Sequence, residues 1–158
     1  MTDWGTDGWA VQPGEGTRVD QDFSWLEVLL RGADVDDVMG AFVFTHPEIP
    51  ENPAHAHLGF MKVLFVLEGH YEFRVGSATF SGGPGTFIVV PRGAHHTFTT
   101  STGGRVLFVC SPSGNEEMFL ELGDLGTDAS AQQVDAIKAR FQTVSLPGAA
   151  GAPWRPRD

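Results

Sequence analysis

Hydrophobic and polar residues alternate with a period of two along most of residues 24–112. In an extended chain this period places the two kinds of side chain on opposite faces, as in the segment HYEFRVG at residues 70–76. The segment KVLFVLEG at residues 62–69 is instead apolar at most positions, which is typical of a strand buried between two layers. Turns rich in glycine and proline separate these segments. The pattern predicts an all-β sandwich or barrel, with further strands at SWLEVLLRG, GAFVFTH, SATF, TFIVVP, HTFTT and RVLFVCSP.

A helical period appears only after Gly114. The segment NEEMFLELG predicts a short helix, and DASAQQVDAIKARF predicts a better one that Asp128 or Ser130 can cap. Hydrophobic residues of the second segment recur at helical spacing, which indicates one apolar face. We therefore expect one or two C-terminal helices to pack across an end or a face of the barrel, with a last short strand at TVSL.

The length of 158 residues suits one domain with a real core and is too short for two. We divide the chain into an N-terminal arm at residues 1–24, a barrel at residues 25–112, and a helical segment with a tail at residues 113–158. The last part is expected to pack on the same domain as the barrel.

The chain carries a net charge of −10, which argues against binding to nucleic acid and against docking on an anionic membrane. Its single cysteine, Cys110, cannot form an internal disulfide and is expected to be an inert buried thiol. No apolar stretch approaches the length of a membrane span, and the N-terminal residues lack a signal-peptide pattern. We therefore expect a cytoplasmic protein whose partner is a small molecule.

Histidines with the spacing of metal ligands occur in two segments. His55 and His57 point to the same side of an extended chain, and paired imidazoles suit Zn, Fe, Ni or Cu. A second segment, GTFIVVPRGAHHTF, ends a strand, turns and leaves with His95 and His96. Because neighbouring residues of a strand face opposite sides, only one of these two histidines can join the first pair.

These two segments resemble the two motifs of the cupins, G(x)5HxH(x)3–4E(x)6G and G(x)5PxG(x)2H(x)3N. The C-terminal segment CSPSGNEEMFLELG, with the helix after it, is also similar to the small cupins described as quercetin-dioxygenase-like. The resemblance covers residues 25–112 and implies a single-domain cupin barrel, which is a double-stranded β-helix or jelly roll. It also implies a metal site of His55, His57 and His96. The matching positions are His55, His57 and Gly69 in the first motif and Gly85, Pro91, Gly93 and His96 in the second.

Three positions depart from the cupin motifs. Ile49 stands at the opening glycine, Thr100 at the closing asparagine, and Lys62 at the glutamate that ligates the metal in the family. Lys62 has three possible roles. It points outward if the loop around Gly59 shifts the register, it points inward as an ammonium that opposes a metal, or it points inward as a neutral base. We expect it to point inward, because the family's residue at this position does.

The resemblance implies a cupin metalloenzyme that uses Fe, Ni or Zn. The leading expectation is a metal-dependent oxygenase or dioxygenase acting on a phenolic, enolic or dicarbonyl substrate. The alternatives are a non-redox cyclase, isomerase or dehydratase that uses a Lewis-acid metal or Lys62, and a non-catalytic ligand-binding barrel. Lys62 and Phe98 are the candidate catalytic residues, because Phe98 shares the strand face of His96 and can form a wall of the pocket.

The hydrophobic pattern also predicts how the remaining aromatic and apolar side chains are placed. Phe87 is expected in the core, and His46, in the loop before PEIP, is expected to be exposed. The outer face of the apolar strand carries Val63, Phe65 and Leu67, which a single small barrel cannot cover. We therefore expect a homodimer.

Overall fold

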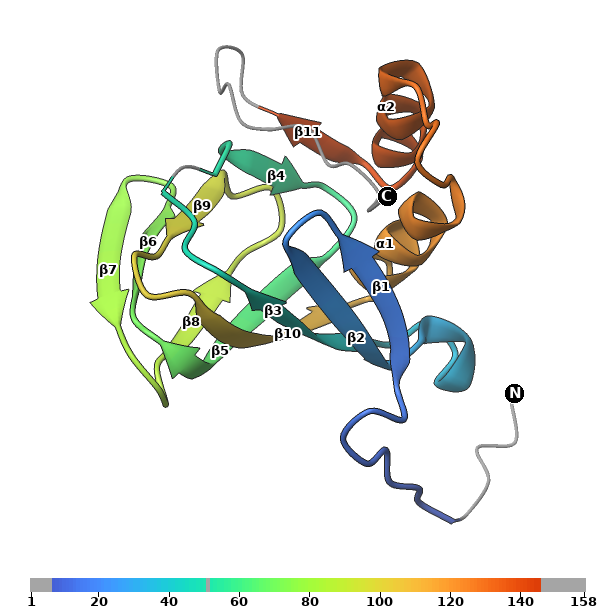
Figure 1. Ribbon diagram of the computed structural model, residues 1–158, viewed down its shortest axis with the longest axis horizontal. Helices are drawn as coiled ribbons and strands as arrows, with labels where there is room; N and C mark the ends of the chain where they lie inside the picture. The colour runs from blue at the N-terminus through green and yellow to red at the C-terminus, as the bar shows by residue number, and fades with distance from the viewer. Residues whose placement is uncertain (1–6, 51, 146–158) are drawn as a thin grey trace.

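The computed structural model describes residues 7–50 and 52–145 and consists of two antiparallel sheets with two helices beside them (Figure 1). The six-stranded sheet has the order β1 (Thr17–Gln21), β2 (Ser24–Leu30), β3 (Gly40–His46), β10 (Gly104–Ser111), β5 (Met61–Gly69) and β8 (Phe87–Val90). The five-stranded sheet has the order β11 (Thr143–Ser145), β4 (His55–His57), β9 (His96–Thr99), β6 (Tyr71–Val75) and β7 (Ala78–Gly82). A short 3-10 helix, Gly32–Asp34, connects β2 to β3.

The main hydrophobic core lies between the two sheets, where side chains from their inner faces pack together. Phe42 of β3 stacks on Phe108 of β10 with ring centroids 4.9 Å apart. Tyr71 and Phe73 of β6 and Phe98 of β9 face them from the other sheet. The alternation read from the sequence therefore gives most strands one buried face, as predicted, whereas β7 and β11 contain no fully buried residue.

Both expected helices are present, as α1 (Asn115–Asp124) and α2 (Ala131–Arg140). Ser130 caps α2, because its hydroxyl accepts a hydrogen bond from the Gln133 backbone N–H while the Gln133 side chain accepts one from the Ser130 N–H. The buried faces of the two helices form a second, smaller core of Met118, Leu122, Val134 and Ile137. In Figure 1 the helices lie beside β1 and β11, on the side of the molecule away from β7. No helix among the described residues has the length and apolar character needed to cross a membrane.

A buried carboxylate attaches α1 to the six-stranded sheet. Glu116 is fully buried, and its oxygens accept hydrogen bonds from the backbone N–H groups of Gly32 at 3.2 Å and Gly114 at 3.1 Å, and from the Cys110 thiol at 3.1 Å. A side chain at Gly40 would overlap the Glu116 carboxyl group, so this glycine makes room for the contact. Burial, with a contribution from Glu116, raises the pKa of the Cys110 thiol to about 12. Cys110 is thus the inert buried thiol that the sequence predicted.

Three expectations need correction. The segment expected to be an arm contains β1, which pairs with β2 and buries Val19. His46 is buried, because it ends β3 facing the core, where its Nδ1 donates to the Pro47 carbonyl oxygen at 2.7 Å and its Nε2 accepts from the Tyr71 hydroxyl at 3.0 Å. Phe87 is 60% exposed, because Ile88 takes the inward position of β8.

The strand that carries Lys62 keeps one register from Met61 to Val66 against β10. No break near Gly59 displaces it, so Lys62, Leu64 and Val66 all point inward. The outward reading of Lys62 is therefore excluded, and the inward expectation is confirmed.

We propose that a second copy of the chain covers the outer face of β5 and β8. These neighbouring strands present Phe87, Val89 and Met61, which are 60%, 48% and 38% exposed. Replacing Phe87 by glutamate is expected to convert a dimer into a monomer, because a carboxylate cannot be buried unpaired in an apolar interface. Light scattering after size-exclusion chromatography at micromolar concentration measures the mass. Phe23→Glu, which changes an exposed residue outside this face, is the matched control; a monomeric wild-type protein would refute the proposal.

Candidate metal site

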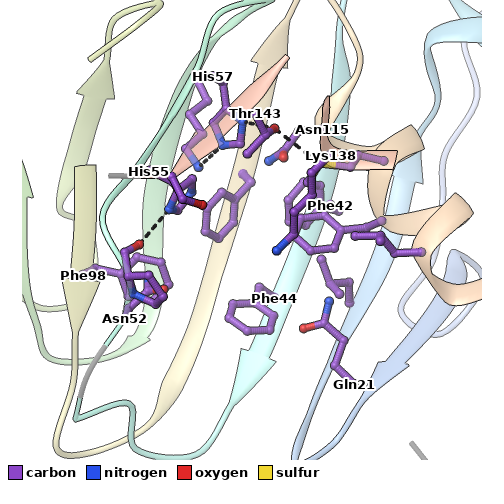
Figure 2. A pocket seen from close by; sticks show the side chains of 18 residues that line it. Gln21, Phe42, Phe44, Asn52, His55, His57, Phe98, Asn115, Lys138 and Thr143 are labelled. Atoms are coloured by element: carbon purple, nitrogen blue, oxygen red, sulfur yellow. Dashed lines mark hydrogen bonds between the residues drawn. The ribbon is translucent and has the colours of Figure 1, made fainter. Parts of the chain in front are cut away.

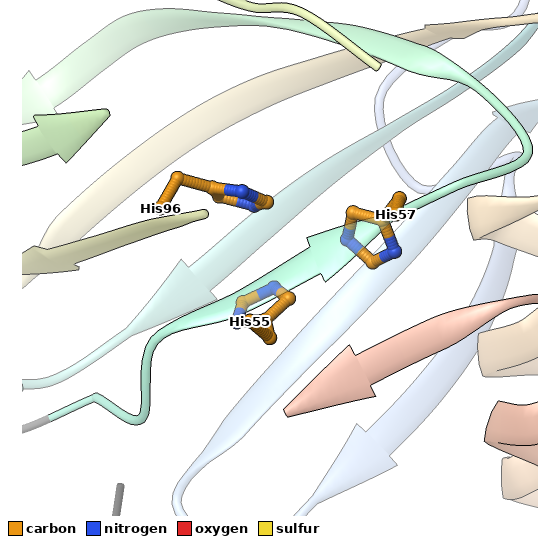
Figure 3. Close-up of side chains that lie close together, drawn as sticks. All are labelled: His55, His57 and His96. Carbon is orange, nitrogen blue, oxygen red and sulfur yellow. The ribbon is translucent and has the colours of Figure 1, made fainter. Parts of the chain in front are cut away.

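Three histidine rings converge at the inner face of the five-stranded sheet (Figure 3). His55 and His57 come from β4, and His96 comes from β9, where it lies directly across the ladder from His55. The ring centroids are 4.4 Å apart for His55 and His96, 5.0 Å for His55 and His57, and 5.4 Å for His57 and His96. One ring nitrogen from each histidine lies within 4.8 Å of the other two, so small ring rotations close them onto a single ion at about 2.0–2.1 Å.

The outer hydrogen bonds of the rings set their tautomers. The Nδ1 atoms of His55 and His96 lie 3.0 Å from the Pro53 carbonyl oxygen and 2.9 Å from the Ala94 carbonyl oxygen. A carbonyl oxygen only accepts, so both Nδ1 atoms carry the proton and both Nε2 atoms keep a lone pair.

A hydroxyl group sets the tautomer of the third ring, that of His57. The Thr143 hydroxyl donates to the Met118 sulfur at 3.4 Å, so Thr143 Oγ1 accepts the Nδ1–H of His57 at 2.9 Å. His57 Nε2 accepts a hydrogen bond from the Lys62 ammonium at 3.3 Å, which again requires a lone pair on Nε2. All three histidines therefore present an unprotonated Nε2, which is the form that ligates a metal.

Two properties of the cluster fit a divalent transition metal. The Nε2 atom of His96 is buried and has no hydrogen-bond partner among the described residues, and such an acceptor needs a ligand. Burial, and secondarily the charge of Lys62, lowers the pKa of His55 to about 4 and lowers the pKa values of His57 and His96 still further. The three rings are therefore neutral at physiological pH and need lose no proton to bind a metal.

Lys62 lies beside this cluster and opposes the metal. Its side chain is 4% exposed, and its Nζ lies 3.3 Å from His57 Nε2 and 5.2 Å from the ring centroid of Phe108. Burial lowers the pKa of Lys62 to about 7, because the charged form loses its hydration. The protonated amine donates to the lone pair of His57 and repels a dication, whereas the neutral amine carries no charge to repel the metal and holds that lone pair less strongly. Metal binding and protonation of Lys62 therefore compete.

A cavity of about 250 Å³ opens against His55, His57 and Lys62 (Figure 2). Its walls are mainly apolar, with aromatic rings from β3, β9, β10 and α1. Phe98, the expected pocket wall, lines this cavity beside Phe108, and the distance between their ring centroids is 6.3 Å. The roles of Lys62 and Phe98 in a reaction stay predictions. The aromatic lining residues are Phe42, Phe44, Phe98, Phe108 and Phe119.

Several residues of the cavity were not found from the sequence. Lys138 of α2, Asn115 of α1, Gln21 of β1 and Thr143 of β11 all line it. They come from segments before and after the motif-bearing part of the chain, so no spacing rule joins them to the histidines. The one signal that could have drawn attention to Lys138 is that the sequence contains only one other lysine, Lys62.

Comparison with known proteins agrees with this architecture. Residues 42–111 match the family described as Cupin domain. Among solved structures, an RmlC-like cupin from Shewanella frigidimarina superposes with a TM-score of 0.59 at 18% identity, covering 71% of this chain and 96% of the other. KdgF from Halomonas sp. gives a TM-score of 0.61 at 15% identity, covering 70% of this chain and 99% of the other.

A third similar structure is Pac13 from Streptomyces, which is described as a nucleoside dehydratase. It gives a TM-score of 0.56 at 15% identity, covering 70% of this chain and 88% of Pac13. No curated protein sequence matches the chain significantly. At these identities the solved structures show the fold alone: a mostly β cupin fold with two antiparallel sheets and two C-terminal helices. The expected fold class is confirmed, and the quercetin-dioxygenase-like subtype stays a prediction.

Proposed function

We propose that this protein is a small-molecule enzyme that binds a phenolic, enolic or dicarbonyl substrate at a divalent metal held by His55, His57 and His96. The observation that carries the proposal is the convergence of three unprotonated Nε2 atoms beside an apolar cavity that also contains a buried lysine. Dioxygenation of the substrate is the leading reaction. A bound metal would supply Lewis acidity to the substrate oxygen and, if it were iron, a position for dioxygen.

The donor set favours an anionic oxygen as the substrate's binding atom. Three neutral imidazoles leave the full charge of a dication uncompensated, and the described part of the chain offers no carboxylate to the cluster. An ionised phenol, enol or dicarbonyl supplies that negative charge. Three histidines also leave open coordination positions on a metal. The substrate and a second small ligand can then bind at the same time.

Different residues of the chain bind the substrate and accept its proton. Lys62 Nζ is placed 3.3 Å from a ligand nitrogen and is buried, so in its neutral form it can accept the proton that the substrate loses on binding. The rings of Phe42, Phe98 and Phe108 exclude water around the substrate and strengthen its electrostatic contacts. Lys62 thus acts as a base only after it has lost its own proton.

A second candidate is a non-redox elimination or isomerisation in the same cavity. The buried lysine favours it, because this chemistry needs a base and a group that stabilises an enolate but no oxidant. Pac13, whose fold is similar, is described as a dehydratase, although that similarity alone does not transfer an activity.

Oxygen consumption separates these functions. Protein purified without added ions is analysed for metal, loaded with Fe²⁺, Ni²⁺ or Zn²⁺, and offered phenolic, enolic and 1,3-dicarbonyl compounds under air and under nitrogen. We expect substrate-dependent oxygen uptake that His96→Ala abolishes together with metal binding, and that Lys62→Met abolishes while the metal stays bound. Turnover under nitrogen would support the second candidate. Ligand binding without any turnover would refute an enzyme and indicate a binding module.

A further inference from the structure

The charges around the cavity differ from those of the rest of the molecule. The chain has 20 acidic residues and a net charge of −10, yet no aspartate or glutamate lines the cavity within the described ranges. Both lysines of the chain do line it. Lys62 lies in the interior beside the histidines, and Lys138 reaches the cavity from α2. The cavity is therefore a local cationic site in an acidic protein, which favours an anionic ligand.

Lys138 is available to such a ligand. It is half-buried. Within the described residues, 7–50 and 52–145, every ion pair uses an arginine as the cation, so none of them involves Lys138. Its side chain lines the same cavity as His55, so its charge acts on a ligand bound there. In Figure 2 Lys138 lies on the same side of the cavity as Asn115 and Thr143, away from Asn52.

Two neutral polar groups of the cavity also lack partners. The Asn115 side chain is 2% exposed and lines the cavity, and its Oδ1 has no hydrogen-bond partner among the described residues. Nε2 of Gln21, which lines the cavity from β1, also has no hydrogen-bond partner among the described residues. Buried polar atoms are rarely left unpaired in proteins, so these two amides indicate a ligand with hydrogen-bonding atoms of its own.

The volume of the cavity limits the size of the ligand. An engineered cavity of about 150 Å³ holds benzene, so by proportion 250 Å³ holds about ten non-hydrogen atoms. The aromatic walls favour a ring or a short alkyl chain between the polar ends. A simple inorganic anion would leave these apolar walls uncovered.

We propose that the ligand is an organic acid with an apolar body, and that Lys138 binds its carboxylate and sets the preference for acids. This assignment rests on the proposed function in one respect, since it places the substrate's ionisable oxygen at the histidines and a second, permanently charged group at Lys138. Lys138 is a specificity-determining residue, Asn115 contacts a polar atom beside it, and Gln21 contacts one at the end of the cavity near Phe44 (Figure 2).

The test compares two probes of equal size, hydrocinnamate and its neutral amide, by titration calorimetry on the full chain at neutral pH. The measurement is made after EDTA treatment and again with Zn²⁺ bound. Wild-type protein is expected to bind the acid about tenfold more tightly than the amide, as a charge-assisted hydrogen bond predicts. Lys138→Met is expected to remove this preference, and Lys138→Arg to keep it.

The control variant is Arg74→Met, which removes one positive charge from an exposed position of β6 outside the cavity and is expected to leave the preference unchanged. Lys138→Gln provides a second neutral variant, and thermal unfolding checks that each protein is folded. Equal affinity of wild-type protein for both probes would overturn the proposal. A preference that survives Lys138→Met but disappears in Lys62→Met would also overturn it, by placing the carboxylate at the histidines.

Failure of this proposal and failure of the proposed function give different results. If Lys138→Met removes the preference for acids but no compound is ever turned over, the binding assignment stands and the enzyme proposal fails. If turnover is found and the acid and amide probes bind equally, the enzyme proposal stands and the assignment of Lys138 fails.

Discussion

Replacing Lys62 by glutamate is expected to tighten Zn²⁺ binding at neutral pH by a hundredfold or more. Lys62 Nζ lies 3.3 Å from His57 Nε2, so a metal on that nitrogen sits within a few ångströms of position 62. At an effective dielectric constant near 20, a unit charge at about 4 Å from a unit charge is worth about 4 kcal/mol. The substitution removes a repulsion and adds a carboxylate ligand, and 1.4 kcal/mol already corresponds to about a tenfold change in affinity.

Competition with a chromophoric chelator measures this affinity. Lys62→Met should fall between wild-type and Lys62→Glu, because it removes the repulsion without adding a ligand. Lys138→Met is the matched control, since it removes the only other lysine, which is half-buried and acts on His55 more weakly than Lys62 does. An unchanged affinity in Lys62→Glu would show that position 62 does not face the metal.

The inward direction of Lys62 was expected from the resemblance to the cupins, and the alternation of side chains along β5 agrees with it. Lys62 shares its parity with Leu64 and Val66, and all three are buried. Alternation also placed His55 and His57 on one face and allowed only one of His95 and His96 to join them. The resemblance to the second cupin motif selected His96, and His95 is exposed. Local rules of this kind recovered the core strands and both helices, whereas the histidine cluster followed from them together with the cupin motifs.

The parts that sequence reasoning missed depend on contacts between distant segments. The polar segment Thr17–Gln21 becomes a strand because β2 offers it an edge. His46 follows an apolar strand and precedes a loop, and contacts with the distant residues Tyr71 and Phe98 help to keep its ring buried. A polar residue next to a loop looks exposed until its partner is known, and the sequence does not identify that partner.

The cavity illustrates the same limit on a larger scale. Its histidines and Lys62 lie within the motif-bearing segment, whereas Lys138 and Asn115 come from the two C-terminal helices. Helical periodicity predicted that the second helix would have an apolar face, and Val134 and Ile137 do form it. It did not predict that Lys138, beside that face, would reach the barrel, because the docking angle of α2 is set by its packing against α1 and β11.

The metal-free protein is expected to become more stable as the pH rises from about 7 to about 10, and Lys62→Met is expected to remove much of this dependence. Burial lowers the pKa of Lys62 from 10.5 to about 7, so between these values the unfolded chain binds a proton that the folded chain does not. The unfolding free energy therefore rises with pH in this window and reaches its full value near the unfolded pKa. A shift of this size corresponds to about 5 kcal/mol, because each pKa unit is worth about 1.4 kcal/mol.

Urea unfolding in EDTA, followed at several pH values for both proteins, measures this difference. At or below pH 7 the wild-type protein carries the whole cost of burying the lysine, so Lys62→Met should be more stable by several kcal/mol there. The two unfolding free energies should converge as the pH approaches 10, since the other titrating groups are common to both chains and cancel in the difference. A constant difference across this range would mean that Lys62 keeps an ordinary pKa, and that the amine beside His57 is still charged when a substrate arrives.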